Sequence, residues 1–250
     1  MIPSVILYII ICKCFKDEKG TAGLPVKLFF LGIVSALVAG GADLLFEDVF
    51  FASFDHESVL YIMISGFLFT AFFEEGCKYL VMRMLTWKNV AFNKTRNAVI
   101  YAMSVALGFG FIENIVYLMF DATFAKVIIR GLLGALGHMF DAAFMSYYYG
   151  QAKYRAAYND MAGVKLCTRR ALLIPILFHG AFDVILLLSD YTVMLFLFCV
   201  FYIVEIVFAV KFLKKSQKEN MWIPVPAQFQ TNPYPADPAP SANNDPPSMG

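Results

Sequence analysis

The sequence contains few charged residues: Asp, Glu, Lys and Arg make up only 16% of its 250 residues, whereas 60% are hydrophobic. This apolar fraction exceeds the usual content of soluble domains, so the composition excludes an ordinary soluble globular protein. The net charge of +1 gives no electrostatic basis for binding nucleic acid. We therefore expect a polytopic membrane protein whose main contact is the lipid bilayer, and no nucleic-acid partner.

Three further features are absent. The five cysteines lie in apolar runs or near helix ends expected in the cytoplasm, so no disulfide framework is predicted. No basic segment precedes residues 2–12 and no small-x-small cleavage site follows them, so this stretch is predicted to be an uncleaved helix. The HExxH motif of soluble zinc proteases is missing as well.

The apolar residues fall into helix-length runs, without the alternation typical of a membrane barrel. Spans near 20 residues fit a hydrocarbon core of about 30 Å. The sequence predicts an all-α bundle of about seven transmembrane helices, near residues 2–15, 26–46, 58–85, 97–120, 124–149, 167–189 and 191–213.

Basic residues are concentrated in alternate loops. Lys and Arg gather around residues 13–27, 88–96, 153–170 and 211–218, whereas the other loops are acidic or nearly free of base. Because such residues accumulate in cytoplasmic loops, we expect the N-terminus outside and the C-terminus in the cytoplasm. An odd number of helices agrees with this orientation.

The composition changes after Lys218, and eight of the eleven prolines lie between Pro224 and Pro247. Such a segment cannot bury enough apolar surface to fold. We expect residues 1–215 to form the membrane domain and residues 216–250 a disordered, Pro-rich cytoplasmic tail.

Two adjacent carboxylates, Glu74 and Glu75, lie well inside the third apolar run. Acids in hydrocarbon are costly and usually functional. A structural ion pair between Glu74 and Lys78, four residues on, is the alternative, but it leaves Glu75 without a partner. The pair is therefore the first candidate for catalysis.

Other helices carry polar residues spaced by about one turn. Glu113 and Tyr117 share a face of the fourth helix, where a carboxylate and a phenol can form a hydrogen bond. Two histidines are each followed by an aspartate about one turn on: His138 with Asp141, and His179 with Asp183. A carboxylate beside an imidazole can fix its tautomer, as in many metal sites.

Depth shows whether these groups can meet. With a rise of about 1.5 Å per residue, Glu75 lies roughly 15 Å, His138 roughly 17 Å and His179 roughly 14 Å from the cytoplasmic helix ends. Glu113 lies about 12 Å from the opposite surface, which is only slightly higher in a core about 30 Å thick. Two histidines and three glutamates at one level are the ligands and base that a zinc hydrolase needs.

In their order on successive helices, these motifs resemble the PrsW family of intramembrane proteases, which is distantly related to the CAAX prenyl endopeptidases and Abi proteins. The resemblance covers about residues 1–215 and rests on four motifs: Glu74-Glu75-x-x-Lys78, Phe111-x-Glu113-Asn114-x-x-Tyr117, His138-x-x-Asp141 and His179-x-x-x-Asp183.

The resemblance implies a peptidase of the cell membrane that cleaves a single-pass membrane protein such as an anti-sigma factor. It implies that Glu74 and Glu75 are catalytic and that Glu113, His138 and His179 belong to the site. We expect Zn²⁺ to be held by His138, His179 and a glutamate, with Glu113 as the candidate. Around these ligands we expect Lys78, Tyr117, Asp141 and Asp183.

Three alternatives remain open at this point. Either Glu74 or Glu75 could be the base, and a metal-free glutamate–histidine mechanism is also possible. A proton- or ion-coupled transporter is the rival from another class, since Asp43 and Glu205 add intramembrane acids. The sequence shows no internal repeat of the kind common in transporters.

Overall fold

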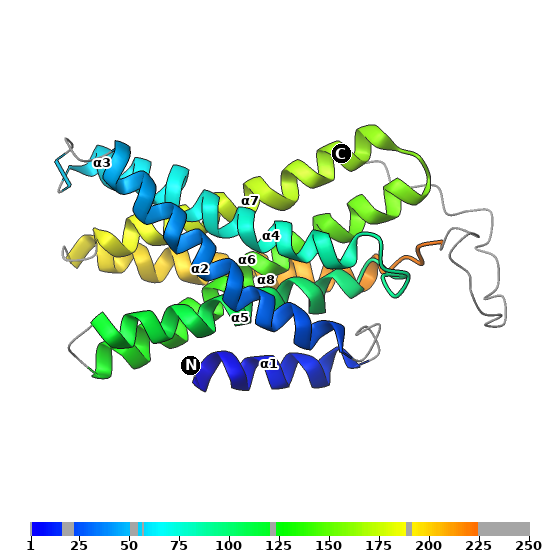
Figure 1. Ribbon diagram of the computed structural model, residues 1–250, viewed down its shortest axis with the longest axis horizontal. Helices are drawn as coiled ribbons and strands as arrows, with labels where there is room; N and C mark the ends of the chain where they lie inside the picture. The colour runs from blue at the N-terminus through cyan, green and yellow to red at the C-terminus, as the bar shows by residue number, and fades with distance from the viewer. Residues whose placement is uncertain are drawn as a thin grey trace.

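The computed structural model describes residues 2–16, 23–50, 55–56, 58–120, 124–188 and 192–224, and these form a bundle of helices (Figure 1). The elements are α1 Ile2–Cys14, α2 Leu24–Phe50, α3 Val59–Ile64, η2 Ser65–Ala71, α4 Phe72–Thr86, α5 Asn97–Phe120, α6 Phe124–Ala157, α7 Met161–Leu187 and α8 Thr192–Lys218. Because α3, η2 and α4 follow one another without a break, the described residues make seven helical segments. The all-helical prediction is confirmed.

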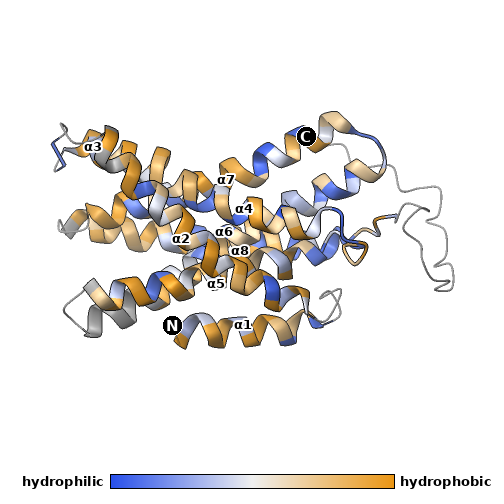
Figure 2. Ribbon diagram, viewed as in Figure 1, coloured by the Kyte–Doolittle hydropathy of each residue, from blue (hydrophilic) through white to orange (hydrophobic). Residues whose placement is uncertain are grey.

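Five of the helical segments are long and apolar enough to cross a membrane: 24–46, 59–86, 97–119, 161–187 and 193–218. Most of the ribbon is hydrophobic, and hydrophilic residues are frequent in the loops and at helix ends (Figure 2). Large apolar side chains such as Leu44, Leu45 and Phe196 are exposed, as expected of helices that face lipid. The expected count of seven crossings stays a prediction.

Helix α5 lies at the centre of the packing. It packs against α1, α2, α4 and α6. In its most apolar stretch 72% of the residues are buried, whereas the corresponding share is 22–33% in the other candidate spans. A central helix can therefore present side chains to several neighbours at once.

Helices α2 and α5 cross at two glycines. A Cβ atom at Gly32 would lie 2.1 Å from the carbonyl oxygen of Val105, and one at Gly108 would lie 1.9 Å from that of Phe29. Since these are backbone atoms, no rotamer change could relieve the overlap. Small residues at such crossings are typical of membrane helix packing.

Helices α6 and α7 extend beyond their predicted ends near residues 149 and 167. A tight turn joins them: Asn159 has a φ of 58°, and the Asp160 side chain caps α7 by accepting a 2.9 Å hydrogen bond from the Gly163 N–H. Hydropathy located only the apolar part of each helix, because the polar turns that continue it carry no membrane signal.

The chain after α8 packs against the segment that joins α4 to α5. The N–H of Thr95 donates to the Met221 carbonyl at 2.9 Å, and the N–H of Ile223 donates to that of Asn93 at 2.7 Å. The side chain of Ile223 is buried. Of the predicted tail at 216–250, the first three residues thus complete α8 and residues 219–224 make these contacts, while residues 225–250 lie outside the described part of the chain.

Candidate active site

The two adjacent glutamates lie in the first turn of α4, directly after the π-helical segment η2. π-Helical turns are rare and frequently found at functional sites. The Thr70 hydroxyl of η2 donates to a carboxylate oxygen of Asp43 on α2 at 3.3 Å. The segment that leads into the glutamates is therefore tied to a neighbouring helix.

Close packing of α7 on η2 brings a histidine to the glutamates. A Cβ atom at Gly180 would lie 2.4 Å from the Phe67 ring, and one at Gly66 would lie 3.0 Å from the Val184 side chain. These two glycines let the helices approach, and His179 precedes Gly180 in the chain. Its imidazole is buried at the interface.

A third glycine makes room for the other histidine. A Cβ atom at Gly110 on α5 would lie 2.9 Å from Cδ2 of His138 on α6. The imidazole of His138 is buried, and its ring centroid lies 5.4 Å from that of His179. Three helices thus bring the glutamates and both histidines to one place.

Lys78 carries the ammonium group at the centre of this cluster. Its Nζ atom donates to Oε1 of Glu75 at 2.8 Å and to Oε2 of Glu74 at 3.2 Å, and it lies 3.1 Å from Nδ1 of His138. The same atom lies 3.9 Å from the centroid of the Phe109 ring. The side chain is 3% exposed, so these contacts replace water almost completely.

The tautomer of His138 follows from its two neighbours. An ammonium group can only donate, so Nδ1 accepts from Lys78 and carries no proton. The proton of a neutral ring is then on Nε2, which donates to Oε2 of Glu113 at 2.6 Å. Glu113 on α5 therefore orients the His138 ring.

Four carboxylates surround His179. Its Nδ1 atom lies 2.9 Å from Oε1 of Glu75 and 3.5 Å from Oδ2 of Asp141. Its Nε2 atom lies 3.4 Å from Oδ2 of Asp183 and 3.5 Å from Oε2 of Glu74. So many carboxylates near one ring are stable in the membrane only when cations offset their charge.

These groups fit a metal ion. One potential ligand atom from each of Glu74, Glu75, His138 and His179 lies within 4.8 Å of the others. Imidazole nitrogen and carboxylate oxygen form the donor set of catalytic zinc sites. The chemistry of the donors and their mutual distances therefore both suit a divalent metal.

Comparison with known proteins agrees with this chemistry. Residues 21–210 match the family described as PrsW family intramembrane metalloprotease. The chain belongs to the PrsW family. Protease PrsW of Halalkalibacterium halodurans is 30% identical over 183 residues, which are 70% of this chain and 78% of that protein. Protease PrsW of Bacillus subtilis is 32% identical over 157 residues, covering 62% and 68% of the two chains. No solved structure matches the chain.

The PrsW assignment makes this chain a multi-pass peptidase of the cell membrane, as predicted. Because its helices are embedded in the lipid bilayer, its substrate is a membrane protein. The Glu/His cluster suits a metal site, so the alternative of a proton- or ion-coupled transporter is not supported.

Eight of the predicted site residues lie in the Glu/His cluster or contact it: Glu74, Glu75, Lys78, Glu113, His138, Asp141, His179 and Asp183. Two relationships differ from expectation. Asp141 contacts His179 instead of the histidine one turn before it, and Glu113 lies outside the four-residue group that could share a metal. The predicted bond between Glu113 and Tyr117 stays a prediction.

Two residues that sequence reasoning left without a site role also belong to this region. Phe109 stacks against the Lys78 ammonium, and Asn114 donates from its side-chain amide to the Gly131 carbonyl at 3.2 Å. Asn114 thereby joins α5 to α6 next to Glu113. In the sequence, the available signal was an amide in an apolar helix directly after a candidate acid.

Glu205 on α8 is the remaining buried acid of this region. Its side chain is 1% exposed, and neither carboxylate oxygen has a hydrogen-bond partner among the described residues. The sequence alone gave it a place only in the transporter alternative.

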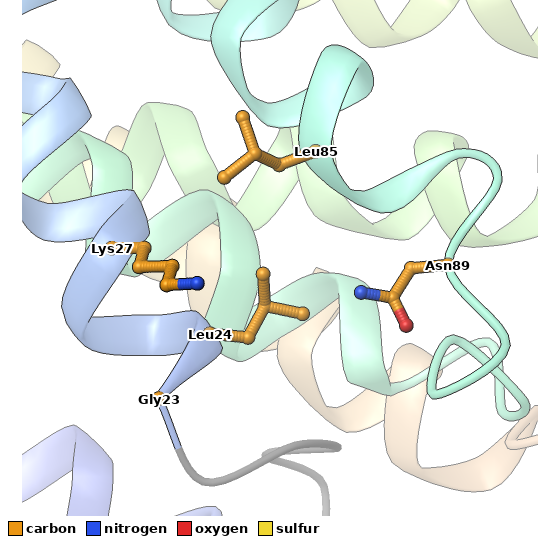
Figure 3. Close-up of a pocket in the computed structure, with 5 residues that line it drawn as sticks. All are labelled: Gly23, Leu24, Lys27, Leu85 and Asn89. Carbon is orange, nitrogen blue, oxygen red and sulfur yellow. The ribbon is translucent and has the colours of Figure 1, made fainter.

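A separate surface pocket of about 350 Å³ lies between the start of α2 and the end of α4. Figure 3 shows its lining residues, Gly23, Leu24, Lys27, Leu85 and Asn89. None of them belongs to the Glu/His cluster. With Leu85 ten residues after Glu75, about 15 Å along the helix, the pocket is distinct from the candidate site.

Proposed function

We propose that the buried cluster hydrolyses a peptide bond of a membrane-anchored protein with the help of a zinc ion. The observation that carries this proposal is the group of four ligand atoms, from three helices, within 4.8 Å of one another. Two of its members are the adjacent glutamates that the family resemblance marks as catalytic.

His138, His179 and a glutamate would hold the ion. When bound, zinc supplies a Lewis acid that polarises the scissile carbonyl and activates water. The unprotonated nitrogen of His138 is Nδ1, which accepts from Lys78 here, and Glu113 fixes this ring through Nε2. Such an outer carboxylate raises the basicity of a metal-binding histidine. The cluster thus favours Glu113 as the group that orients His138.

The two glutamates differ in solvent exposure and in how closely their neighbours hold them. Glu75 is 1% exposed and is held by contacts of 2.8 and 2.9 Å to Lys78 and His179. Glu74 is 15% exposed, and its contacts to the same two residues are longer, at 3.2 and 3.5 Å. A general base must reach the water that it deprotonates. We therefore assign the base to Glu74 and the ligand or positioning role to Glu75.

The substrate that we propose is a single-pass membrane protein such as an anti-sigma factor, the class implied by the family resemblance. A site in the middle of a helical bundle meets its substrate within the bilayer. We further propose that the chain crosses the membrane seven times, with the N-terminus outside and the C-terminus in the cytoplasm, as the loop charges predict.

Cleavage of co-expressed single-pass proteins tests this function. The wild-type chain should release a shortened product that disappears in Glu74→Gln and Glu75→Gln variants of equal abundance. Product of the same size and amount in both variants would contradict the proposed site.

A further inference from the structure

The position of Lys78 raises a question of charge that the proposed chemistry does not answer. Its ammonium contacts three of the four residues that could bind the metal, namely Glu74, Glu75 and His138. The fourth, His179, shares the Glu75 oxygen that Lys78 contacts. A fixed positive charge is thus located among the ligand atoms themselves.

The contact with His138 shows that Lys78 and a metal ion exclude each other at this residue. The lone pair of Nδ1 can accept from the ammonium or bind a metal, but it cannot do both. The other ring nitrogen is already bound to Glu113 at 2.6 Å. A metal ion on Nδ1 therefore requires the Lys78 ammonium to leave that atom.

We propose that Lys78 is a built-in counter-cation that balances the charge of Glu74, competes with the metal ion for Glu75 and His138, and so sets the metal affinity of the site. This inference rests on the proposed metal-dependent function. The lysine keeps the paired carboxylates stable in the membrane until metal arrives. Its flexible stem lets Nζ move away from Nδ1 while the ammonium keeps its contact with the Phe109 ring.

Two opposite consequences follow. Removing the positive charge should strengthen metal binding, because the ion no longer has to displace a cation or bear its repulsion. It should also destabilise the protein without metal, because the buried carboxylates lose their partner. A lysine that only joined residues of one helix would not strengthen metal binding when removed.

The test is a zinc titration of purified protein in nanodiscs against a competing chelator, combined with thermal unfolding in the presence of EDTA. Lys78→Met keeps the length of the side chain and removes its charge. Lys78→Gln is also neutral and keeps a hydrogen-bond donor, so it serves if Lys78→Met does not accumulate. Arg83→Met is the matched control, because it removes one charge from the same helix at a residue that contacts Tyr79 and Trp87.

We expect Lys78→Met or Lys78→Gln to bind zinc about tenfold more tightly or better, with a lower unfolding temperature in EDTA, and Arg83→Met to bind zinc as the wild type does. Unchanged or weaker zinc binding in the Lys78 variants, with binding still lost in His138→Ala, would overturn the competition and leave the metal site standing. If neither the wild type nor either Lys78 variant bound zinc, both the competition and the proposed metal site would be overturned. An unchanged unfolding temperature in EDTA would overturn the counter-cation role.

Discussion

The Nδ1 atom of His179 lies 2.9 Å from Oε1 of Glu75, although 104 positions separate the two residues in the chain. This contact joins α7 to α4 inside the membrane domain, and both side chains are buried. Neither residue would be stable there alone. This buried pairing of a carboxylate with an imidazole lies at the core of the candidate site.

The first prediction concerns the two glutamates. Glu75→Gln and Glu74→Gln keep the shape of each side chain and remove its charge and basicity, so each should lower cleavage by about 10²–10⁴-fold. The double variant should be little worse than either single one, because residues that act as a unit are not additive. Product per folded molecule is the measurement.

Asp43→Asn is the control for this series. Asp43 is an acid of α2 that accepts from Thr70, and asparagine keeps an acceptor for that hydroxyl. Its turnover should stay close to that of the wild type. Equal losses of turnover in Asp43→Asn and Glu75→Gln would show that the effect is not specific to the glutamates of the candidate site.

The second prediction separates the roles of Asp183 and His179, whose side chains lie 3.4 Å apart. If Asp183 orients the ring, Asp183→Asn should lower metal affinity or activity by about 10–100-fold. His179→Ala should remove nearly all of both. If the contact were purely structural, its loss would instead lower the stability of the protein by about 0.6 kcal/mol, reduce its accumulation, and leave specific activity intact.

The third prediction tests the helix crossing at Gly108. Gly108→Ala forces a Cβ atom against the Phe29 carbonyl, so it should destabilise the protein by about 3 kcal/mol or more. Gly134→Ala on α6 meets nothing within 4 Å and should be neutral or stabilising by up to about 1 kcal/mol. Unfolding of both variants in the same detergent is the comparison. Similar stabilities would contradict the close α2–α5 crossing.

The fourth prediction concerns the proposed orientation. In a cysteine-free background, a cysteine at position 55 should react with a membrane-impermeant reagent on intact cells, whereas one at position 159 should react only after permeabilisation. The opposite pattern would reverse the assigned orientation of the chain.

Local spacing and depth predicted much of the geometry of the candidate site. The i,i+4 spacing placed Asp183 beside His179, and the counted depths placed Glu75 and His179 at one level, as the structure has them. The rotation of each helix about its axis could not be predicted. The face that α6 turns toward α7 is one result of this rotation, and for that reason the contact of Asp141 with His179 was not predicted.

The fold was predictable to a similar degree. Apolar runs located the helices, because hydrocarbon requires each backbone to satisfy its own hydrogen bonds. They gave no sign of the π-helical segment Ser65–Ala71 or of the close approach at Gly180, since both depend on how α7 packs on η2. The central position of Lys78 likewise depends on three helices meeting.

The most direct test of the central claim is the zinc content of the purified protein, measured per folded molecule together with cleavage, for the wild type and for His138→Ala. A metal-dependent peptidase should contain about one zinc ion, lose cleavage on treatment with a chelator, and recover it when zinc is returned. His138→Ala should bind little zinc and cleave nothing. A wild-type protein that cleaves fully after the chelator has removed all metal, or a His138→Ala variant that keeps both zinc and turnover, would contradict the account.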